Sequence, residues 1–277
     1  PRKRLGQNFL TSRAILERIV DAAQLSPQDL VLEVGPGLGA LSLAMAPLCG
    51  GLIAVELDER FIPPLREILA PFPQVRIVQG DILRMDIAEL LKGSGFSSPP
   101  LVYKVVSNLP YYATSAIIRH LLEARKQPEL LVLTVQKEVA ERIVAGPGDM
   151  SLLAVSVQFY GRPQIVAHIG RGAFYPAPEV DSATLRIDIP PSLPLPEGER
   201  SAFFRVVRAG FGQARKQLRN SLSAGLRIPA EVVADEMARA GFDPRGRAQE
   251  LGVEEWVALY RALSGLIGGK GEDGPGQ

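Results

Sequence analysis

The fold is decided by one stretch of sequence, Val31-Leu32-Glu33-Val34-Gly35-Pro36-Gly37-Leu38-Gly39. It begins with a short apolar run of the kind that forms a buried strand, and a helical stretch at residues 40–46 follows it. Glycines between a strand and a helix leave the amides of the helix N-terminus open to a bound ligand. The stretch therefore predicts a strand, a ligand-binding loop and a helix in succession.

Similar short runs of apolar and β-branched residues follow this loop and alternate with helical stretches. That alternation is typical of a parallel sheet with helices on both faces. Three later runs are joined by short turns rich in glycine and proline, and they predict an antiparallel end to the same sheet. We expect parallel strands at residues 31–34, 52–56, 75–79, 102–107 and 130–135, and antiparallel strands at 153–160, 164–169 and 183–189.

A proline-rich segment, residues 190–196, cannot continue a helix or a central strand and marks a domain boundary. Beyond it, helical periods at residues 200–223, 230–240 and 253–267 predict a small helical domain. We expect a ligand-binding catalytic domain at 1–190 with a basic arm at 1–12, a linker at 191–197, the helical domain at 198–267 and a flexible tail at 268–277.

The composition is that of a soluble protein with a sizeable core, since 46% of its 277 residues are hydrophobic and 22% are charged. Its one cysteine, Cys49, cannot form an intrachain disulfide, which fits a reducing compartment. The N-terminal residues lack the apolar core of a signal peptide, and no apolar run is long enough to span a bilayer. We expect a cytoplasmic protein with no membrane partner.

The net charge of +1 conceals two clusters of basic residues. One is the N-terminal arm, and the other is the segment 200–227, which has no acidic residue. A helix that is merely solvated normally mixes both signs, so these clusters predict contact with a polyanion. On a helical wheel the basic residues of the second cluster fall within an arc of about 100°, unless Gly210 and Gly212 shift the phase. The predicted phosphate-binding residues are Arg2, Lys3, Arg4, Arg205, Arg208, Arg215, Lys216 and Arg219.

The glycine loop alone does not identify its ligand. Gly35, Gly37 and Gly39 fit a site for S-adenosylmethionine, but Gly35-x-Gly37-x-x-Ala40 also fits a looser dinucleotide pattern. Glu56 ends the second expected strand, where a carboxylate can accept hydrogen bonds from both hydroxyls of a ribose. Asp81 ends the third, where it either accepts a hydrogen bond from an adenine amino group or caps a helix before Ile82. Two carboxylates behind a glycine loop favour a nucleotide-like ligand.

The fourth expected strand ends in Ser107-Asn108-Leu109-Pro110-Tyr111-Tyr112, a segment that indicates the reaction. An adenine N6 is a poor nucleophile because its lone pair is delocalised into the ring, so its methylation needs acceptors for both N–H groups. The side-chain oxygen of Asn108 and the carbonyl of Leu109 or Pro110 provide them, and proline stiffens the loop. Tyr111 can stack on the base once the base has left its helix. The alternative is a proline turn with two tyrosines in the core.

With these motifs the chain resembles the ribosomal RNA adenine dimethyltransferases, the KsgA/RsmA-like family. The matching motifs run from near the first residue into the C-terminal segment, and their order and spacing agree together. They are Arg4-Leu5-Gly6-Gln7-Asn8-Phe9-Leu10, the loop from Glu33 to Gly39, Glu56, Gly80-Asp81, Asn108-Leu109-Pro110-Tyr111, Gln136-Lys137-Glu138-Val139-Ala140-Glu141-Arg142, Phe174-Tyr175-Pro176-Ala177-Pro178-Glu179-Val180-Asp181-Ser182, and Phe211-Gly212-Gln213-Ala214-Arg215-Lys216-Gln217-Leu218-Arg219-Asn220-Ser221-Leu222.

The resemblance implies an α/β fold of the Rossmann-like class I methyltransferase type. Such a fold has a doubly wound, mostly parallel seven-stranded sheet with an antiparallel end, here followed by a small all-helical C-terminal domain. It implies dimethylation of adenine N6 atoms in the 16S RNA of the small ribosomal subunit, with S-adenosylmethionine as the methyl donor. We expect the precursor of that subunit as partner, no metal and a monomer.

The resemblance also implies roles for individual residues. Phe174 would stack on the target adenine opposite Tyr111, although without the family it could equally be a core residue. The chain departs from many relatives at Ala214, where they carry a basic residue, and at Gln249, where they carry proline. The implied catalytic residues are Asn108, Leu109, Pro110, Tyr111 and Phe174, and the implied cofactor-binding residues are Gln7, Asn8, Leu10, Gly35, Gly37, Gly39, Glu56, Leu57, Asp81, Ile82 and Asn108.

Other chemistries lack their residues. His120 and His168 do not have the spacing of metal ligands, and Cys49 is not placed for covalent methylation of cytosine. Two alternatives stay open beside small-subunit methylation. One is the related methylation of 23S RNA that confers macrolide resistance, against which residues 174–182 and the basic C-terminal motif argue. The other is an RNA-binding role in ribosome assembly without catalysis.

Overall fold

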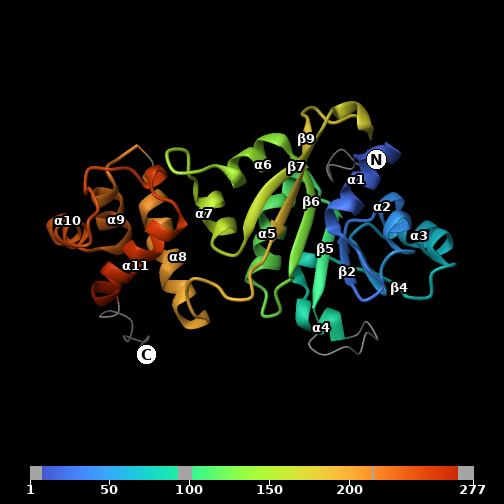
Figure 1. The fold of residues 1–277 in the computed structure, drawn as a ribbon, viewed down its shortest axis with the longest axis horizontal. Coiled ribbons are helices and arrows are strands. Elements are labelled where there is room, and N and C mark those ends of the chain that lie inside the picture. The colour runs from blue at the N-terminus through green and yellow to red at the C-terminus, as the bar shows by residue number, and fades with distance from the viewer. Residues whose placement is uncertain (1–7, 93–101, 214, 268–277) are drawn as a thin grey trace, which may run out of the picture. The chain divides into compact units, whose positions relative to one another are not determined.

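The computed structural model describes residues 8–92, 102–213 and 215–267 (Figure 1). Its central feature is a sheet of seven strands in the spatial order β4-β3-β2-β5-β6-β9-β7. The first five strands in this order are parallel, and β9 is antiparallel to both of its neighbours. The strands are β2 Leu30–Val34, β3 Gly51–Glu56, β4 Val75–Gln79, β5 Tyr103–Asn108, β6 Leu130–Gln136, β7 Arg162–Ile169 and β9 Ser182–Asp188.

The predicted fold class is confirmed, because the sheet is mostly parallel and ends antiparallel. Each of the five parallel strands begins and ends within one residue of its predicted range. The strand predicted at residues 153–160 is wrong, since Leu152–Gln158 forms the helix α7. Val155 and Val157 favour a strand by propensity, but the hydroxyl of Ser151 accepts a hydrogen bond from the Ala154 amide at 3.1 Å and caps a helix there.

A second, two-stranded sheet joins distant parts of the chain. Phe9–Leu10 (β1) pairs antiparallel with Phe174–Tyr175 (β8), with Phe9 opposite Tyr175 and Leu10 opposite Phe174. This short ribbon ties the N-terminal segment to the residues that precede β9.

The strand β7 forms one edge of the large sheet. Its side chains alternate between more and less exposed positions, and Pro163 stands near its start. Its pairing with β9 shifts register between Ile165 and Ala167. The edge is therefore irregular along its length.

The helices follow the strands in the order expected of a doubly wound sheet (Figure 1). No helix within the described ranges is long and apolar enough to cross a membrane. The helices are α1 Arg13–Ala23, α2 Ala40–Met45, α3 Ile62–Leu69, α4 Ile87–Lys92, α5 Thr114–Glu123, α6 Lys137–Val144, α7, α8 Glu197–Phe211, α9 Leu218–Leu226, α10 Ala230–Arg239 and α11 Val253–Ile267.

The main core lies against the sheet, whose central strands are buried on both faces. Val31 and Val106 pack with apolar residues of α1 and α2 on one face. Leu32, Val105 and Leu131 point to the other face and are 0% exposed. Burial on both faces explains why these strands are nearly continuous apolar runs in the sequence.

The chain divides into two compact units. Within the described residues, unit 1 consists of residues up to Glu141 and of Tyr160–Pro191, and unit 2 consists of Arg142–Phe159 and of residues from Ser192 onward. The sequence pattern instead predicts that residues 142–159 belong to the catalytic domain. These residues belong to unit 2, where Phe159 stacks on Phe203 with ring centroids 4.7 Å apart.

The helix predicted at residues 200–223 is interrupted. It consists of α8, which ends at Phe211, and α9, which begins at Leu218. A Cβ atom on Gly210 would lie 2.3 Å from the Trp256 ring, so glycine is required for this close packing. The helix α8 also begins at Glu197, inside the expected linker. The basic residues of this segment therefore do not lie on one continuous helix.

Candidate active site

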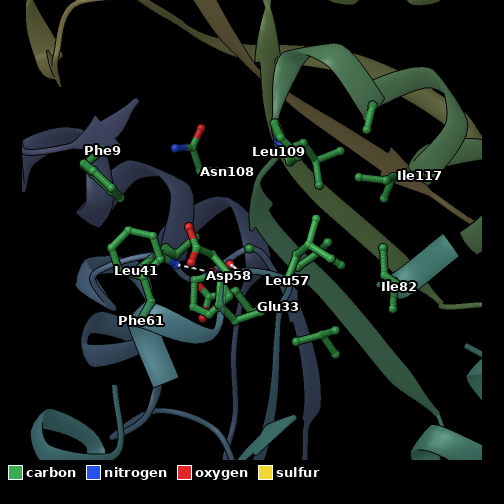
Figure 2. Close-up of a pocket in the computed structure, with 18 of the residues that line it drawn as sticks. Phe9, Glu33, Leu41, Leu57, Asp58, Phe61, Ile82, Asn108, Leu109 and Ile117 are labelled. Atoms are coloured by element: carbon green, nitrogen blue, oxygen red, sulfur yellow. Dashed lines mark hydrogen bonds between the residues drawn. The ribbon is translucent and has the colours of Figure 1, made fainter. Parts of the chain in front are cut away.

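A cavity opens at the carboxyl ends of the parallel strands (Figure 2). It lies where β2 and β5 are neighbours, the point at which the strand order reverses and where doubly wound sheets bind their ligands. All of its lining residues belong to unit 1. They include Asn8, Phe9, Leu10, Glu33, Gly35, Gly37, Glu56, Leu57, Asp58, Asp81, Ile82, Asn108, Leu109, Pro110, Tyr111 and Tyr112.

The glycine loop has a backbone that favours glycine at three positions. Gly35, Gly37 and Gly39 have φ angles of 70°, 56° and 78°. A Cβ atom on Gly39, which precedes α2, would lie 2.6 Å from Cδ1 of Ile68. The conformation that turns the chain from β2 into α2 therefore excludes side chains, and it leaves Gly35 and Gly37 on the cavity wall.

Glu56 is fixed at the end of β3 by backbone donors. Its Oε2 accepts a hydrogen bond from the Gly37 amide at 2.9 Å, and its Oε1 accepts one from the Asp58 amide at 2.8 Å. The side chain is 6% exposed, and burial raises the pKa of its carboxyl. Glu56 thus connects the end of β3 to the glycine loop, and its side chain lies in the wall of the cavity.

Glu33 is a second buried carboxyl in the cavity wall, which the sequence analysis did not select as a site residue. Its Oε2 accepts a hydrogen bond from the Ser42 hydroxyl at 2.5 Å. Burial and the nearby charge of Glu56 raise the pKa of Glu33 to about 8, so it carries a proton at neutral pH. The signal in the sequence was an acid within an otherwise apolar buried strand.

Asp81 caps a short turn and also lines the cavity. Its Oδ1 accepts a hydrogen bond from the Leu83 amide at 3.1 Å and caps the short turn that follows β4. The residue also lines the cavity, beside Ile82. A capping role therefore does not remove Asp81 from the site.

The charge of the lining is one-sided. Four carboxyl groups, those of Glu33, Glu56, Asp58 and Asp81, line the cavity, and that of Glu33 is protonated at neutral pH. No lysine, arginine or histidine lines it among the described residues. Asp58 is paired with Arg60, whereas neither Glu33 nor Glu56 makes an ion pair with a described residue. The cavity therefore favours a ligand that is cationic or rich in hydrogen-bond donors and disfavours an anionic one.

Asn108 ends β5 with its side chain in a fixed orientation. Its Nδ2 donates a hydrogen bond to the carbonyl oxygen of Asn8 at 3.1 Å. No other described residue donates to its Oδ1, which is free to accept a hydrogen bond from a ligand. The backbone of the N-terminal segment thus decides which end of the amide faces the cavity (Figure 2).

Of the two carbonyls expected as acceptors after Asn108, only that of Leu109 is free of hydrogen bonds from described residues. The Pro110 carbonyl accepts hydrogen bonds from the Ala113 amide and from the Thr114 hydroxyl, each at 3.1 Å. The Leu109 amide is held by the Thr134 carbonyl at 3.1 Å. Leu109 is therefore the better candidate for the backbone acceptor.

Tyr111 is the partly buried aromatic residue of this segment. Its hydroxyl lies 2.5 Å from Oγ of Ser182, the first residue of β9. The neighbouring Tyr112 is 60% exposed. Both tyrosines line the cavity, so the alternative of two core tyrosines does not describe this turn.

Phe174 is not in the cavity, contrary to its predicted stacking position. It is 4% exposed and packs in the main core with Leu10 and Ile169. Its pairing with Leu10 across the β1–β8 ribbon directs the ring inward. In this structure Phe174 is a core residue, as the sequence alone allowed, and stacking on a base would require another rotamer.

The predicted RNA-binding residues are distributed over several elements. Arg205 and Arg208 lie exposed on α8, Arg215 and Lys216 lie exposed between the helices, and Arg219 lies on α9 with a buried Nε that has no described partner. Gln7, Arg2, Lys3 and Arg4 lie outside the described residues. No group of three potential metal ligands is found within the described ranges.

Comparison with known proteins agrees with this geometry. The family model described as ribosomal RNA adenine dimethylase matches residues 1–263. A ribosomal RNA small subunit methyltransferase A of Dehalococcoides mccartyi is 47% identical over 258 residues, which cover 93% of this chain and 87% of that protein. A protein of the same name from Moorella thermoacetica is 43% identical over 268 residues, 95% of this chain and 92% of that one.

Solved structures show the same architecture. The crystal structure of the 23S rRNA methyltransferase ErmE superposes with a TM-score of 0.72 at 28% identity, covering 93% of this chain and all 100% of that one. Both the sequence relatives and the shared fold extend over nearly the whole chain. This chain belongs to the ribosomal RNA adenine dimethylase family.

Proposed function

We propose that this protein dimethylates the N6 atoms of adenines in the 16S RNA of the small ribosomal subunit, with S-adenosylmethionine as methyl donor. The observation that carries the proposal is Asn108, whose Oδ1 is free to accept a hydrogen bond at the carboxyl end of β5. The names of the relatives at 47% and 43% identity favour the small-subunit RNA as substrate.

The residues of the cavity fit S-adenosylmethionine better than a dinucleotide. A dinucleotide would bring a pyrophosphate into a cavity whose described lining has four carboxyls and no basic side chain. When bound, S-adenosylmethionine supplies a methyl group on a positively charged sulfur. Glu56 is placed to accept hydrogen bonds from ribose hydroxyls, and Asp81 and Ile82 to hold the adenine ring. The other proposed contacts are Gln7, Asn8, Leu10, Gly35, Gly37, Gly39, Leu57 and Asn108.

The acceptor side is formed by the segment after β5. The Oδ1 of Asn108 and the carbonyl oxygen of Leu109 accept the two N–H groups of the target adenine, which frees the nitrogen lone pair. Pro110 fixes the turn, and Tyr111 stacks on the base after it has been extruded from the RNA. No general base is needed, because the methylated nitrogen loses its proton readily.

The substitution Asn108→Ala tests this proposal. We expect methyl transfer to fall by at least about 100-fold, as when one preorganised transition-state contact is removed. Calorimetric affinity for S-adenosylmethionine should stay within a few-fold, since Glu56 and the glycine loop are untouched. Ser115→Ala, an exposed change at the start of α5, is the matched control. Full transfer by Asn108→Ala would overturn the assignment.

The RNA substrate is tested with labelled cofactor on both ribosomal subunits. Transfer to the small-subunit RNA, mapped to its nucleotides, is the expected result. Transfer to the 23S RNA instead would favour the activity named for the solved structure at 28% identity. Transfer to neither, with RNA binding retained, would favour an assembly role.

We propose that the protein acts in the cytoplasm as a monomer.

The basic residues of unit 2 and of the N-terminal arm are proposed to bind RNA phosphates. Replacing Arg215, Lys216 and Arg219 by alanine should weaken RNA binding. It should also reduce the slope of log affinity against log salt concentration by about one for each lost phosphate contact. The control replaces Arg66, Arg239 and Arg261, which removes the same charge elsewhere. Equal salt slopes for the two triple variants would contradict the assignment.

A further inference from the structure

The hydrogen bond between Tyr111 and Ser182 connects two segments that are 71 residues apart in sequence. Tyr111 begins the short turn Tyr111–Ala113 directly after the β5 loop, and Ser182 begins β9. In the sheet, β6 lies between β5 and β9. The tyrosine side chain therefore extends past the end of β6 to reach its partner at 2.5 Å.

Ser182 is a rigid anchor for this bond. It is 0% exposed and is paired on both sides, with Gln136 of β6 and with Ile169 of β7. The preceding residue, Asp181, is held as well, because its carbonyl accepts a hydrogen bond from the Lys137 amide and its carboxylate accepts one from the Arg171 amide, each at 3.0 Å. The backbone that carries the Ser182 hydroxyl is therefore fixed by its two neighbouring strands.

The tyrosine, in contrast, has few other polar restraints. It lies on a short turn, is only partly buried and lines the cavity. Burial raises the pKa of its phenol, so the hydroxyl keeps its proton at neutral pH and the hydrogen bond persists. A ring held at its base by the turn and at its tip by Ser182 has one orientation in the cavity.

The same strand offers an internal comparison. Thr184 lies two residues after Ser182 and points to the same face of the sheet. Its Oγ1 is buried and has no hydrogen-bond partner among the described residues. The strand β9 therefore carries two neighbouring buried hydroxyls. The Ser182 hydroxyl bonds to Tyr111, a residue that lines the cavity, whereas the Thr184 hydroxyl bonds to no described residue.

We propose that Ser182 is a positioning residue for methyl transfer, which acts by holding the ring of Tyr111 in the orientation that stacks on the substrate adenine. The inference rests on the proposed role of Tyr111 in base stacking. Ser182 itself touches neither the base nor the cofactor. Its effect is on how often the ring is ready to receive the base, so it should change the KM for RNA more than kcat.

A double-mutant cycle on the full-length protein tests the inference. Ser182→Ala and Tyr111→Phe each delete the same bond from opposite ends while keeping the ring. Each should lower kcat/KM for RNA by about tenfold, the equivalent of one buried hydrogen bond, mainly through KM. Because both changes remove one bond, the double variant should be no worse than either single one. Calorimetric affinity for S-adenosylmethionine should not change.

Thr184→Val is the matched control, and it should leave kcat/KM unchanged. Full activity of Ser182→Ala, or a double variant whose loss equals the product of the two single losses, would overturn the inference. If Ser182→Ala lowers the melting temperature, Tyr111→Phe still removes the bond from the cavity side and decides the outcome.

A further arm separates this inference from the proposed function. Tyr111→Ala removes the ring itself and should reduce kcat/KM more than Tyr111→Phe does. Full activity of Tyr111→Ala would overturn the stacking role, and the inference with it. A loss in Tyr111→Ala with none in Ser182→Ala would overturn the positioning role alone. Absence of transfer by the unaltered protein would overturn the proposed function.

Discussion

The two ends of the cavity are built from contacts of very different range. At the donor end, which we define as Glu33, the glycine loop, Glu56 and Asp81, the hydrogen bonds of the carboxyl side chains join residues 2 to 19 positions apart. At the acceptor end, which we define as Asn108 to Tyr111, the hydrogen bonds that orient the side chains of Asn108 and Tyr111 join residues 100 and 71 positions apart. One end is completed within consecutive strand–helix units, and the other only when the whole of unit 1 has folded.

This difference decides what each end depends on. A donor end made of local contacts keeps its geometry as long as β2, β3 and β4 are paired. The acceptor end also needs the β1–β8 ribbon, because Asn8 precedes β1, and it needs the antiparallel end of the sheet, because Ser182 begins β9. Substitutions far from the cavity should therefore disturb the acceptor end first.

The largest expected effect concerns Phe174, which anchors the ribbon in the core. Phe174→Ala should lower the free energy of unfolding by about 3–5 kcal/mol, as is usual for truncating a buried phenylalanine. Denaturant titration measures this, and Tyr175→Ala, a change at a residue that is 70% exposed, is the control. Unchanged stability together with a raised KM for RNA would place Phe174 at the base after all, and the ribbon would then contact substrate directly.

An intermediate effect is expected at Glu56. Glu56→Ala should weaken binding of S-adenosylmethionine by about 10–100-fold, the effect of losing hydrogen bonds to a buried carboxylate. Calorimetry measures the change, and Glu59→Ala, an exposed acid three residues further along, removes the same charge. RNA affinity should stay constant. A comparable loss of RNA affinity would show that the donor and acceptor ends of the cavity are coupled.

The smallest expected effect, taken per pH unit, is a pH dependence from Glu33. The folded protein keeps the proton on Glu33 up to its pKa of about 8, whereas the unfolded chain loses it near 4.5. Unfolding therefore releases a proton between these values, and stability falls as pH rises through this window, by at most about 1.4 kcal/mol per pH unit.

Glu33→Gln cannot release that proton and should lack this part of the slope. Urea unfolding of both proteins at several pH values between about 5 and 9 measures the difference, with Glu67→Gln on the surface of α3 as control. Parallel stability curves for wild type and Glu33→Gln would mean that Glu33 is ionised in the folded protein.

The range of these contacts also explains what the sequence could predict. The parallel strands, the glycine loop, Glu56 and Asp81 follow from local patterns, because propensity and position at a strand end are properties of short segments. The residues from Asn108 to Tyr111 were recognised from the chemistry that adenine requires. The partners that orient them, Asn8 and Ser182, could not be read from spacing, since they are brought near by pairing across the sheets.

Contacts between distant segments also accompany the places where the structure departs from these expectations. The run at residues 153–160 has the composition of a strand, but Ser151 caps a helix there, and Phe159 at its end packs against Phe203 of unit 2. Near the end of α8, just before the break, Gly210 packs closely against Trp256 of α11. Phe174 was predicted to stack on the base from its family motif, whereas its pairing with Leu10 places it in the core.

The irregular edge of β7 has a consequence for the behaviour of the protein at high concentration. An unpaired edge strand invites strands of other molecules to add to it, and a regular ladder of free amides is what they need. Pro163 contributes no amide hydrogen, and the register shift between Ile165 and Ala167 disturbs the repeat. This edge therefore resists intermolecular strand addition, which protects the β9 strand behind it, and with it Ser182, from the onset of aggregation.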